Sequence, residues 1–201
     1  MLLIGVTGGI GSGKSEACRI FQTLGGQTLD SDSIAKLLME QDDRVKKRVR
    51  VIVGADVYFE DGRLDRKALA RLIFSDDSIL KKINDVVHPA VVQFIENEAN
   101  RLEKVGDIKL LFTESALIYE AGIEDMFDYI VMVYTTPEQA IARLVCTQKF
   151  SRADVLERMK TQSPPDKNAQ RADFVIYNDG DAKELEARCR FVHSILLSLS
   201  K

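Results

Sequence analysis

The sequence predicts an α/β fold: a doubly wound, mostly parallel sheet of five strands. Short apolar runs typical of buried parallel strands recur along the 201 residues, and segments with helical spacing separate them. The first run leads through a glycine-rich segment into a helix, the order found in such sheets. We expect the strands at residues 2–7, 27–29, 109–114, 129–134 and 173–177.

Helical segments follow the predicted strands. The first helix ends at Gly25-Gly26, a common stop signal. A later one begins at Thr136-Pro137, a capping residue followed by proline at the first helical position. A basic amphipathic helix is expected over 152–160, and Ser163-Pro164-Pro165 indicates a loop after it.

The stretch 32–107 breaks this alternation and contains several helical patterns, near 34–38, 68–73 and 79–87, with a long helix from Pro89. We expect one domain, made of a core, a helical insertion and a small lid. The predicted boundaries are about 1–31, 108–145 and 170–201 for the core, 32–107 for the insertion and 146–169 for the lid.

Composition excludes several classes of protein. The net charge of −3 gives no basic field for nucleic acid. No apolar run approaches the roughly 18 residues that span a membrane, and the apolar opening is too short for a signal peptide. Three dispersed cysteines indicate reduced thiols. We therefore expect a cytoplasmic protein, a monomer or small homo-oligomer, without nucleic-acid or membrane partners.

The strongest motif runs from Gly8 to Ser15 and matches G-x-x-x-x-G-K-[ST], the phosphate-binding P-loop. Its glycines let successive N–H groups point at phosphate oxygens, and the following helix adds the positive end of its dipole. Lys14 is expected to reach the β- and γ-phosphates, and the Ser15 hydroxyl to ligate Mg²⁺. The residues expected to bind ATP are Gly9, Gly11, Ser12, Gly13, Lys14, Ser15, Glu16 and Asn178.

A P-loop alone does not name a reaction. The sequence contains neither the N-K-x-D nor the D-x-x-G motif of GTPases. A compact core with a helical insertion and a basic lid favours phosphoryl transfer to a small molecule, because lid closure excludes water. A nucleoside monophosphate kinase or another small-molecule kinase is the alternative, and a slowly hydrolysing nucleotide switch is a more distant one.

An ordered set of segments runs through nearly the whole chain: the run from Thr7 to Ser15, Asp30-Ser31-Asp32, Gly62 to Arg66, Phe74, His88-Pro89, Leu117 to Gly122, Phe127-Asp128, Gln139, Arg143, Arg158, Gln162 and Ala172 to Asn178. In these segments the chain resembles the dephospho-coenzyme A kinases. The resemblance implies transfer of the ATP γ-phosphoryl group to the ribose 3′-hydroxyl of dephospho-coenzyme A. ATP and Mg²⁺ are the implied cofactors, and dephospho-coenzyme A the implied partner.

The chain departs from the family pattern in three places. Glu16 replaces a common threonine, at a position that can act through its backbone. Glu114 and Ala116 replace aspartate and proline, although glutamate can still hold magnesium or its water. Thr147 and Gln148 stand where a second lid arginine and its neighbour are usual, which leaves Lys149 or Arg152 as the substitute cation.

Each proposed role has a structural alternative. Asp32 is expected to accept the proton of the attacking hydroxyl, or else to cap the next helix. Glu114 is expected to bind magnesium, or else to be a buried strand-end carboxylate. Arg143 is expected to steady the transferring phosphoryl group, or else to lie on a solvated face. Asn178 is expected in the adenine pocket, or else in a simple turn.

On the acceptor side, Arg66 and His88 are expected to meet the anionic coenzyme. Arg66 follows Asp65, so it also fits a helix start, and His88 precedes Pro89, so it also fits a hydrogen-bonded structural histidine. Asp30 fits a turn-forming role as well as it fits a functional one. His193 is expected to take no part in the chemistry.

Overall fold

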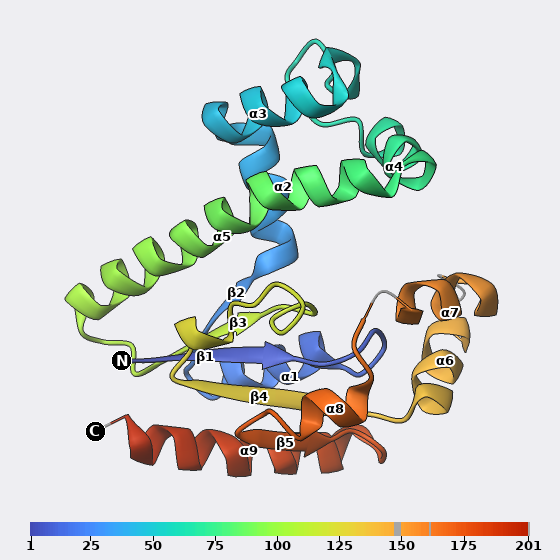
Figure 1. Cartoon of the computed structure of the whole chain (residues 1–201). Coiled ribbons are helices and arrows are strands. Elements are labelled where there is room, and N and C mark those ends of the chain that lie inside the picture. Colours follow the sequence, from blue (N-terminus) through green and yellow to red (C-terminus); the bar gives the residue numbers. More distant parts are fainter. Residues whose placement is uncertain (147–149, 161, 201) are drawn as a thin grey trace. The chain divides into compact units, whose positions relative to one another are not determined.

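Figure 1 shows the chain as a computed structural model, which describes residues 1–146, 150–160 and 162–200. The backbone divides into two compact units. One comprises Met1–Asp30 with Ala99–Lys201, and the other comprises Ser31–Glu98. The predicted boundaries of core, insertion and lid stay a prediction.

The first unit is built on a five-stranded sheet with the order β2-β3-β1-β4-β5. Every neighbouring pair is parallel, which confirms the predicted α/β class and makes the sheet all-parallel. The carboxyl ends of the strands therefore meet at one edge, where such sheets bind ligands. The strands are β1 (Leu2–Thr7), β2 (Gln27–Asp30), β3 (Leu110–Glu114), β4 (Tyr129–Tyr134) and β5 (Phe174–Tyr177).

Two helices, α1 (Lys14–Thr23) and α9 (Ala182–Leu199), cover one face of this sheet and share its apolar core. Figure 1 shows α9, in red, running beside β5. Phe21 of α1 stacks on Phe112 of β3 with ring centroids 4.3 Å apart, and both are fully buried. Offset or stacked aromatic pairs add to the hydrophobic gain from burial. This packing fixes α1, and with it the loop that precedes α1.

The opposite face is covered by the loop after β3. Ile118 is fully buried there and packs with Phe127 and Ile130. A Cβ added to Gly5 would lie 2.7 Å from Ile118 Cδ1, so a glycine in the middle of β1 lets this loop approach the sheet. The 3₁₀ turn η2 (Glu124–Met126) completes the loop.

Three further helices belong to this unit: α6 (Pro137–Cys146), α7 (Arg152–Lys160) and α8 (Pro165–Ala169). The first two confirm the predicted helices after strand four. The predicted loop is present at Ser163 and Pro164, but Pro165 already occupies the first helical position of α8, where proline's missing N–H costs nothing.

The second unit contains α2 (Ser31–Gln41), α3 (Asp43–Val53), η1 (Ala55–Val57), α4 (Arg66–Ser75) and most of α5 (Asp77–Val105). Helix α3 was not expected, because its basic run obscures the buried pair Val45 and Val49. Its start is nevertheless well marked: the Asp42 carboxylate accepts hydrogen bonds from the backbone N–H groups of Arg44 and Val45.

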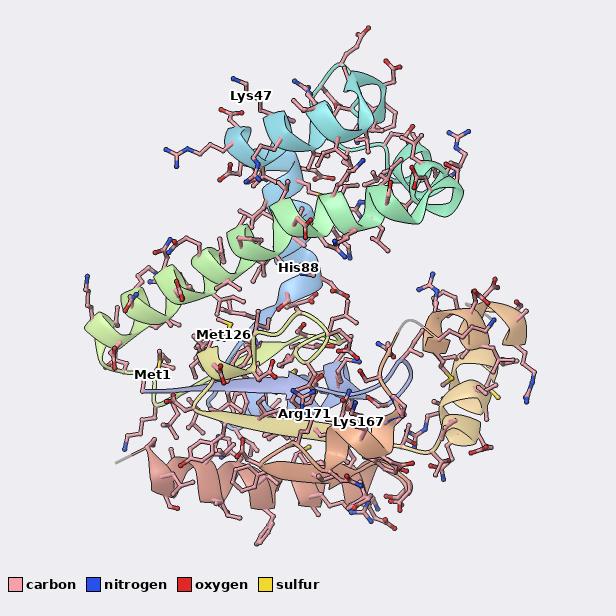
Figure 2. All side chains as sticks on the ribbon, in the orientation of Figure 1. Met1, Lys47, His88, Met126, Lys167 and Arg171 are labelled. Carbon is pink, nitrogen blue, oxygen red and sulfur yellow. The ribbon has the colours of Figure 1, made fainter. Side chains whose placement is uncertain are left out.

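The expected separate helix from Pro89 is wrong, because α5 runs through that residue without a break. Figure 2 shows His88 in the middle of this helix. An interior proline costs about 3 kcal/mol or more, since it removes one helical hydrogen bond. Burying each large aliphatic side chain contributes about 1.5–3 kcal/mol, which offsets that loss. The buried stripe along α5 comprises Ile83, Val86, Val87, Val91, Ile95 and Leu102.

All three cysteines are free thiols, as expected: Cys18 and Cys189 are buried and Cys146 is exposed. In the described part of the chain, no helix combines the length and the apolar character needed to cross a bilayer.

Candidate active site

The glycine-rich loop lies between β1 and α1, at the carboxyl edge of the sheet. Gly13 caps α1 with φ +95°, a left-handed conformation that favours glycine. A Cβ at Gly13 would also lie 2.3 Å from Asn178 Nδ2. The loop therefore requires glycine here both for its backbone conformation and for the close approach of a neighbouring side chain.

Lys14 and Ser15 open α1 and place two different groups at the loop. Lys14 Nζ donates to the carbonyl oxygens of Gly8 (2.8 Å) and Gly9 (3.1 Å), so its ammonium lies over the loop. The Ser15 hydroxyl donates to Glu114 Oε1 at 2.7 Å. The structure thus brings together the two residues that the sequence assigned to magnesium, although they are 99 positions apart.

Two carboxylate residues, Glu114 and Asp30, lie at the carboxyl ends of the neighbouring strands β3 and β2. Glu114 is the last residue of β3, and its register partner on β2 is Asp30. Hydroxyl and carboxylate oxygens are the hard donors that Mg²⁺ prefers, usually one or two carboxylates together with substrate phosphates. Ser15 and Glu114 fit that pattern. No cluster of three or more acidic, histidine or cysteine side chains occurs within residues 1–146, 150–160 and 162–200.

Asn178 follows β5 and contacts the glycine loop directly. Its Nδ2 donates to the Ser12 carbonyl oxygen at 2.7 Å, in a buried hydrogen bond. The backbone carbonyl oxygen of Asn178 accepts a hydrogen bond from Arg143 Nη2 at 2.8 Å. Arg143 is thereby held against Asn178 rather than on a solvated face, and its buried Nη1 has no hydrogen-bond partner among the described residues.

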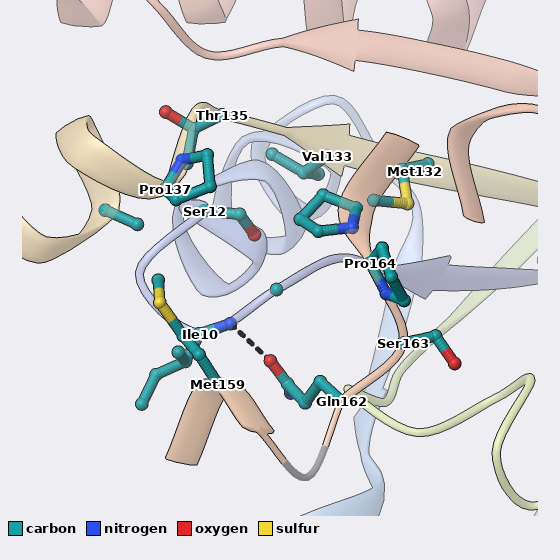
Figure 3. Close-up of a pocket in the computed structure, with 13 residues that line it drawn as sticks. Ile10, Ser12, Met132, Val133, Thr135, Pro137, Met159, Gln162, Ser163 and Pro164 are labelled. Carbon is teal, nitrogen blue, oxygen red and sulfur yellow. Dashed lines mark hydrogen bonds between the residues drawn. The ribbon is translucent and has the colours of Figure 1, made fainter. Parts of the chain in front are cut away.

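A cavity of about 250 Å³ lies behind the loop. Figure 3 shows its walls, formed by Ile10 and Ser12 of the loop, Met132 and Val133 of β4, and Met159 of α7 among others. The Ser12 hydroxyl is fully buried and unpaired within the described part of the chain.

Sequence reasoning assigned no role to Gln162, which binds the loop directly, or to Glu120, which binds the residue after Gln162. The Ile10 N–H donates to Gln162 Oε1 at 2.9 Å. The next residue, Ser163, donates its N–H to Glu120 Oε1 at 2.7 Å. The resemblance had picked out the segments that contain Gln162 and Glu120, but it gave no contact for either.

Two predicted residues, Glu16 and Asp32, lie in the first turns of helices α1 and α2. Glu16 forms a solvent-exposed ion pair with Arg19 one turn along α1, and hydrogen bonding from that guanidinium lowers the pKa of Glu16. Its side chain therefore turns to α1, which leaves only its backbone for a phosphate. Asp32 lies in the first turn of α2, so it is part of the helix and not the residue before it.

The predicted acceptor-side residues belong to the helical unit. Arg66 is the first residue of α4, behind the Asp65 cap, and its Nη2 lies 3.5 Å from Glu40 Oε1. His88 is half-buried on α5. Burial lowers the pKa of His88, and the nearby Asp85 carboxylate opposes that shift. The lowered pKa favours the neutral imidazole of His88, a hydrogen-bonding group without charge.

Lys149 and Arg152 are the residues predicted to replace the usual lid arginine. Thr147, Gln148 and Lys149 lie outside the described residues. Arg152 is the first residue of α7, and Arg158, on the same helix, lies over the Phe150 ring with its guanidinium carbon 4.4 Å from the ring centroid.

Comparison with known proteins gives one consistent result. Residues 2–184 match the family model described as dephospho-CoA kinase. The dephospho-CoA kinase of Chlorobaculum tepidum is 37% identical, over 98% of this chain and 96% of that protein. That of Geobacter sulfurreducens is 34% identical, over 94% and 95% respectively. The crystal structure of TT1252 from Thermus thermophilus superimposes with a TM-score of 0.80 at 35% identity, covering 98% of this chain and 97% of that one.

Proposed function

The chain belongs to the dephospho-CoA kinase family and is therefore a phosphotransferase, and we propose that its glycine loop holds the ATP whose γ-phosphoryl group passes to the ribose 3′-hydroxyl of dephospho-coenzyme A. The observation that carries this proposal is the meeting of Ser15 and Glu114, 2.7 Å apart, beside the loop. A hydroxyl and a carboxylate at that place suit a magnesium–triphosphate and not a bare phosphate anion.

The triphosphate is bound by the backbone N–H groups of the loop and by Lys14. The Lys14 ammonium bonds two loop carbonyls, and both contacts can be exchanged for phosphate oxygens that carry full negative charge. The N-terminus of α1 adds its dipole. Gly9, Gly11, Ser12, Gly13 and the backbone of Glu16 complete the proposed ATP contacts.

Ser15 and Glu114 would hold Mg²⁺. The ion, when bound, screens the charge of the phosphate oxygens during transfer. Glu114 has the longer side chain where aspartate is usual in the family. Its carboxylate nevertheless reaches the Ser15 hydroxyl, which supports the view that the substitution preserves the site.

Asp32 is the proposed acceptor of the proton from the attacking hydroxyl. It follows the carboxyl end of β2 by two residues, and that end, at Asp30, is in register with Glu114. Replacing Asp32 with asparagine should lower turnover roughly 10²- to 10⁴-fold and leave ATP binding largely intact. Unchanged turnover would remove the assignment.

Arg143 and Asn178 are proposed to act on the nucleotide. The buried Nη1 of Arg143 has no partner within the described residues, so a charged N–H remains for the transferring phosphoryl group or its nucleotide. Asn178 links Arg143 to the loop, which supports a place beside the adenosine for both. Arg66 and His88 of the helical unit are proposed to meet the coenzyme.

One coupled assay tests the function. Purified protein with ATP and Mg²⁺ should release ADP quickly only when dephospho-coenzyme A is present. ADP release with a nucleoside monophosphate but not with dephospho-coenzyme A would indicate a nucleotide kinase. Release that is slow and independent of any acceptor would indicate a switch. The free thiols are consistent with the proposed cytoplasmic location.

A further inference from the structure

The Ile10 N–H group is bound by a side chain from a distant part of the chain. It donates to Gln162 Oε1 at 2.9 Å, across 152 sequence positions, and Figure 3 draws this contact as a dashed line. Gly9 lies beside it, because a Cβ added there would be 3.8 Å from Gln162 Oε1. The glutamine amide thus lies against the first half of the phosphate-binding loop.

Gln162 is itself held in place. The Ser163 N–H donates to Glu120 Oε1, which ties the backbone next to Gln162 to the loop after β3. Pro164 and Pro165 then fix the backbone into α8. Further along, Asp166 accepts a 2.7 Å hydrogen bond from the Tyr134 hydroxyl at the end of β4. The acceptor for Ile10 therefore sits on a segment that the core restrains at two points.

A side-chain amide also binds the second half of the loop, but there the amide donates the hydrogen bond. There Asn178 Nδ2 donates to the Ser12 carbonyl oxygen, whereas Gln162 accepts from the Ile10 N–H. Two side-chain amides thus hold one loop from two remote segments. Such a loop needs restraint, because Gly11 and Gly13 adopt positive φ and glycine gives the backbone many alternative conformations.

We infer that Gln162 is a positioning residue for phosphoryl transfer: through the Ile10 N–H it fixes the P-loop in the conformation that receives the triphosphate. This inference rests on the proposed function. Its amide also joins the loop to the segment that follows α7, the helix that carries Arg152 and Arg158. Transfer is sensitive to placement, and a shift of about 1 Å can cost roughly 10²-fold in rate.

Three variants test the inference. Gln162→Ala removes the acceptor, Gln162→Glu keeps an oxygen for the Ile10 N–H, and Gln170→Ala changes an exposed glutamine at the end of α8 as a matched control. We expect Gln162→Ala to lower kcat/KM for ATP about 10- to 100-fold. The KM for dephospho-coenzyme A and the thermal midpoint should stay at the wild-type values. Gln162→Glu should recover part of kcat, and Gln170→Ala should match wild type.

A second measurement needs no activity. In the protein without nucleotide, hydrogen exchange at the Ile10 amide should accelerate at least about 10-fold in Gln162→Ala, and in Glu120→Ala to a smaller extent. Exchange at the Leu111 amide, in the buried strand β3, should not change.

The results separate two failures. An active wild type together with a Gln162→Ala variant of unchanged kcat/KM for ATP would overturn the positioning role alone. Equal acceleration of Ile10 amide exchange in the alanine and glutamate variants, measured without nucleotide, would do the same, because the retained oxygen would then have no effect. A wild-type protein that never responds to dephospho-coenzyme A would instead overturn the proposed function.

Discussion

The substitution Gly13→Ala tests the close approach of Asn178 to the phosphate-binding loop. The new methyl group would lie 2.3 Å from Asn178 Nδ2, well inside van der Waals contact. Gly13 also has φ +95°, so an alanine there is strained even before any collision. Gly25 provides the matched control, because its φ is +96° and a Cβ added there meets nothing within 4 Å.

The two substitutions should lower the free energy of unfolding by different amounts, because only Gly13→Ala disturbs the contact with Asn178. A left-handed backbone costs an L-residue roughly 1–2 kcal/mol, and this part is common to Gly13→Ala and Gly25→Ala. At Gly13 the Asn178 amide must also move away, which leaves the buried Ser12 carbonyl without its donor at about 1–3 kcal/mol. The free energy of unfolding should therefore fall by about 2–5 kcal/mol in Gly13→Ala and by about 1–2 kcal/mol in Gly25→Ala.

Urea unfolding of the two variants, and of each combined with Asn178→Ala, measures the difference. In the Asn178→Ala background the amide is absent, so Gly13→Ala should cost about the same as Gly25→Ala. The reasoning is refuted if Gly13→Ala and Gly25→Ala destabilise the original protein equally. It is also refuted if the excess loss at Gly13 survives removal of the Asn178 side chain.

Three other predictions use independent features. Glu114→Gln should raise the Mg²⁺ concentration for half-maximal activity roughly 10- to 100-fold, because a neutral amide replaces the carboxylate beside Ser15; an unchanged titration would contradict the magnesium assignment. At pH 8 a thiol reagent should modify only the exposed Cys146 in the native protein. Burial raises the pKa of Cys189 to about 12 and raises that of Cys18 further still. Mass spectrometry of the alkylated peptides checks this prediction. Burial lowers the pKa of His193, so the unfolded state binds more protons than the folded state, and stability should fall as the pH drops from about 7 through 6.5. Urea midpoints measure this decline, and it should be less steep in His193→Gln. An equally steep decline in that variant would exclude His193 as its cause.

The sequence could predict the sheet and the loop because both depend on local patterns. The strand β4 is a run of buried aliphatic residues with its side chains covered on both faces, and such a run has few alternative interpretations. Gly8 to Ser15 is likewise a contiguous motif whose spacing alone predicts its backbone. The meeting of Ser15 and Glu114 is consistent with this topology, because the glycine loop that leads to Ser15 follows β1, and Glu114 ends the neighbouring parallel strand β3.

Other features could not be predicted, because long-range packing decides them. Pro89 is a strong local signal for a helix boundary, yet the apolar stripe of α5 outweighs it. The basic helix α3 has only two buried residues, Val45 and Val49, and its charged residues conceal their spacing. In both helices the free energy of burial exceeds the local preference, and burial is not visible in a short window of sequence.

The side-chain amides at the glycine loop show a second reason for such failures. Glutamine and asparagine are common surface residues, and nothing in the sequence around Gln162 or Asn178 indicates which backbone group each will bind. Their contacts nevertheless act on a motif that the sequence does reveal. A glycine loop suits phosphate because its N–H groups can converge, but the same freedom lets it leave that conformation. Since side chains outside the loop bind Ile10 and Ser12, we expect the conformation that receives phosphate to depend on residues that lie outside the P-loop motif.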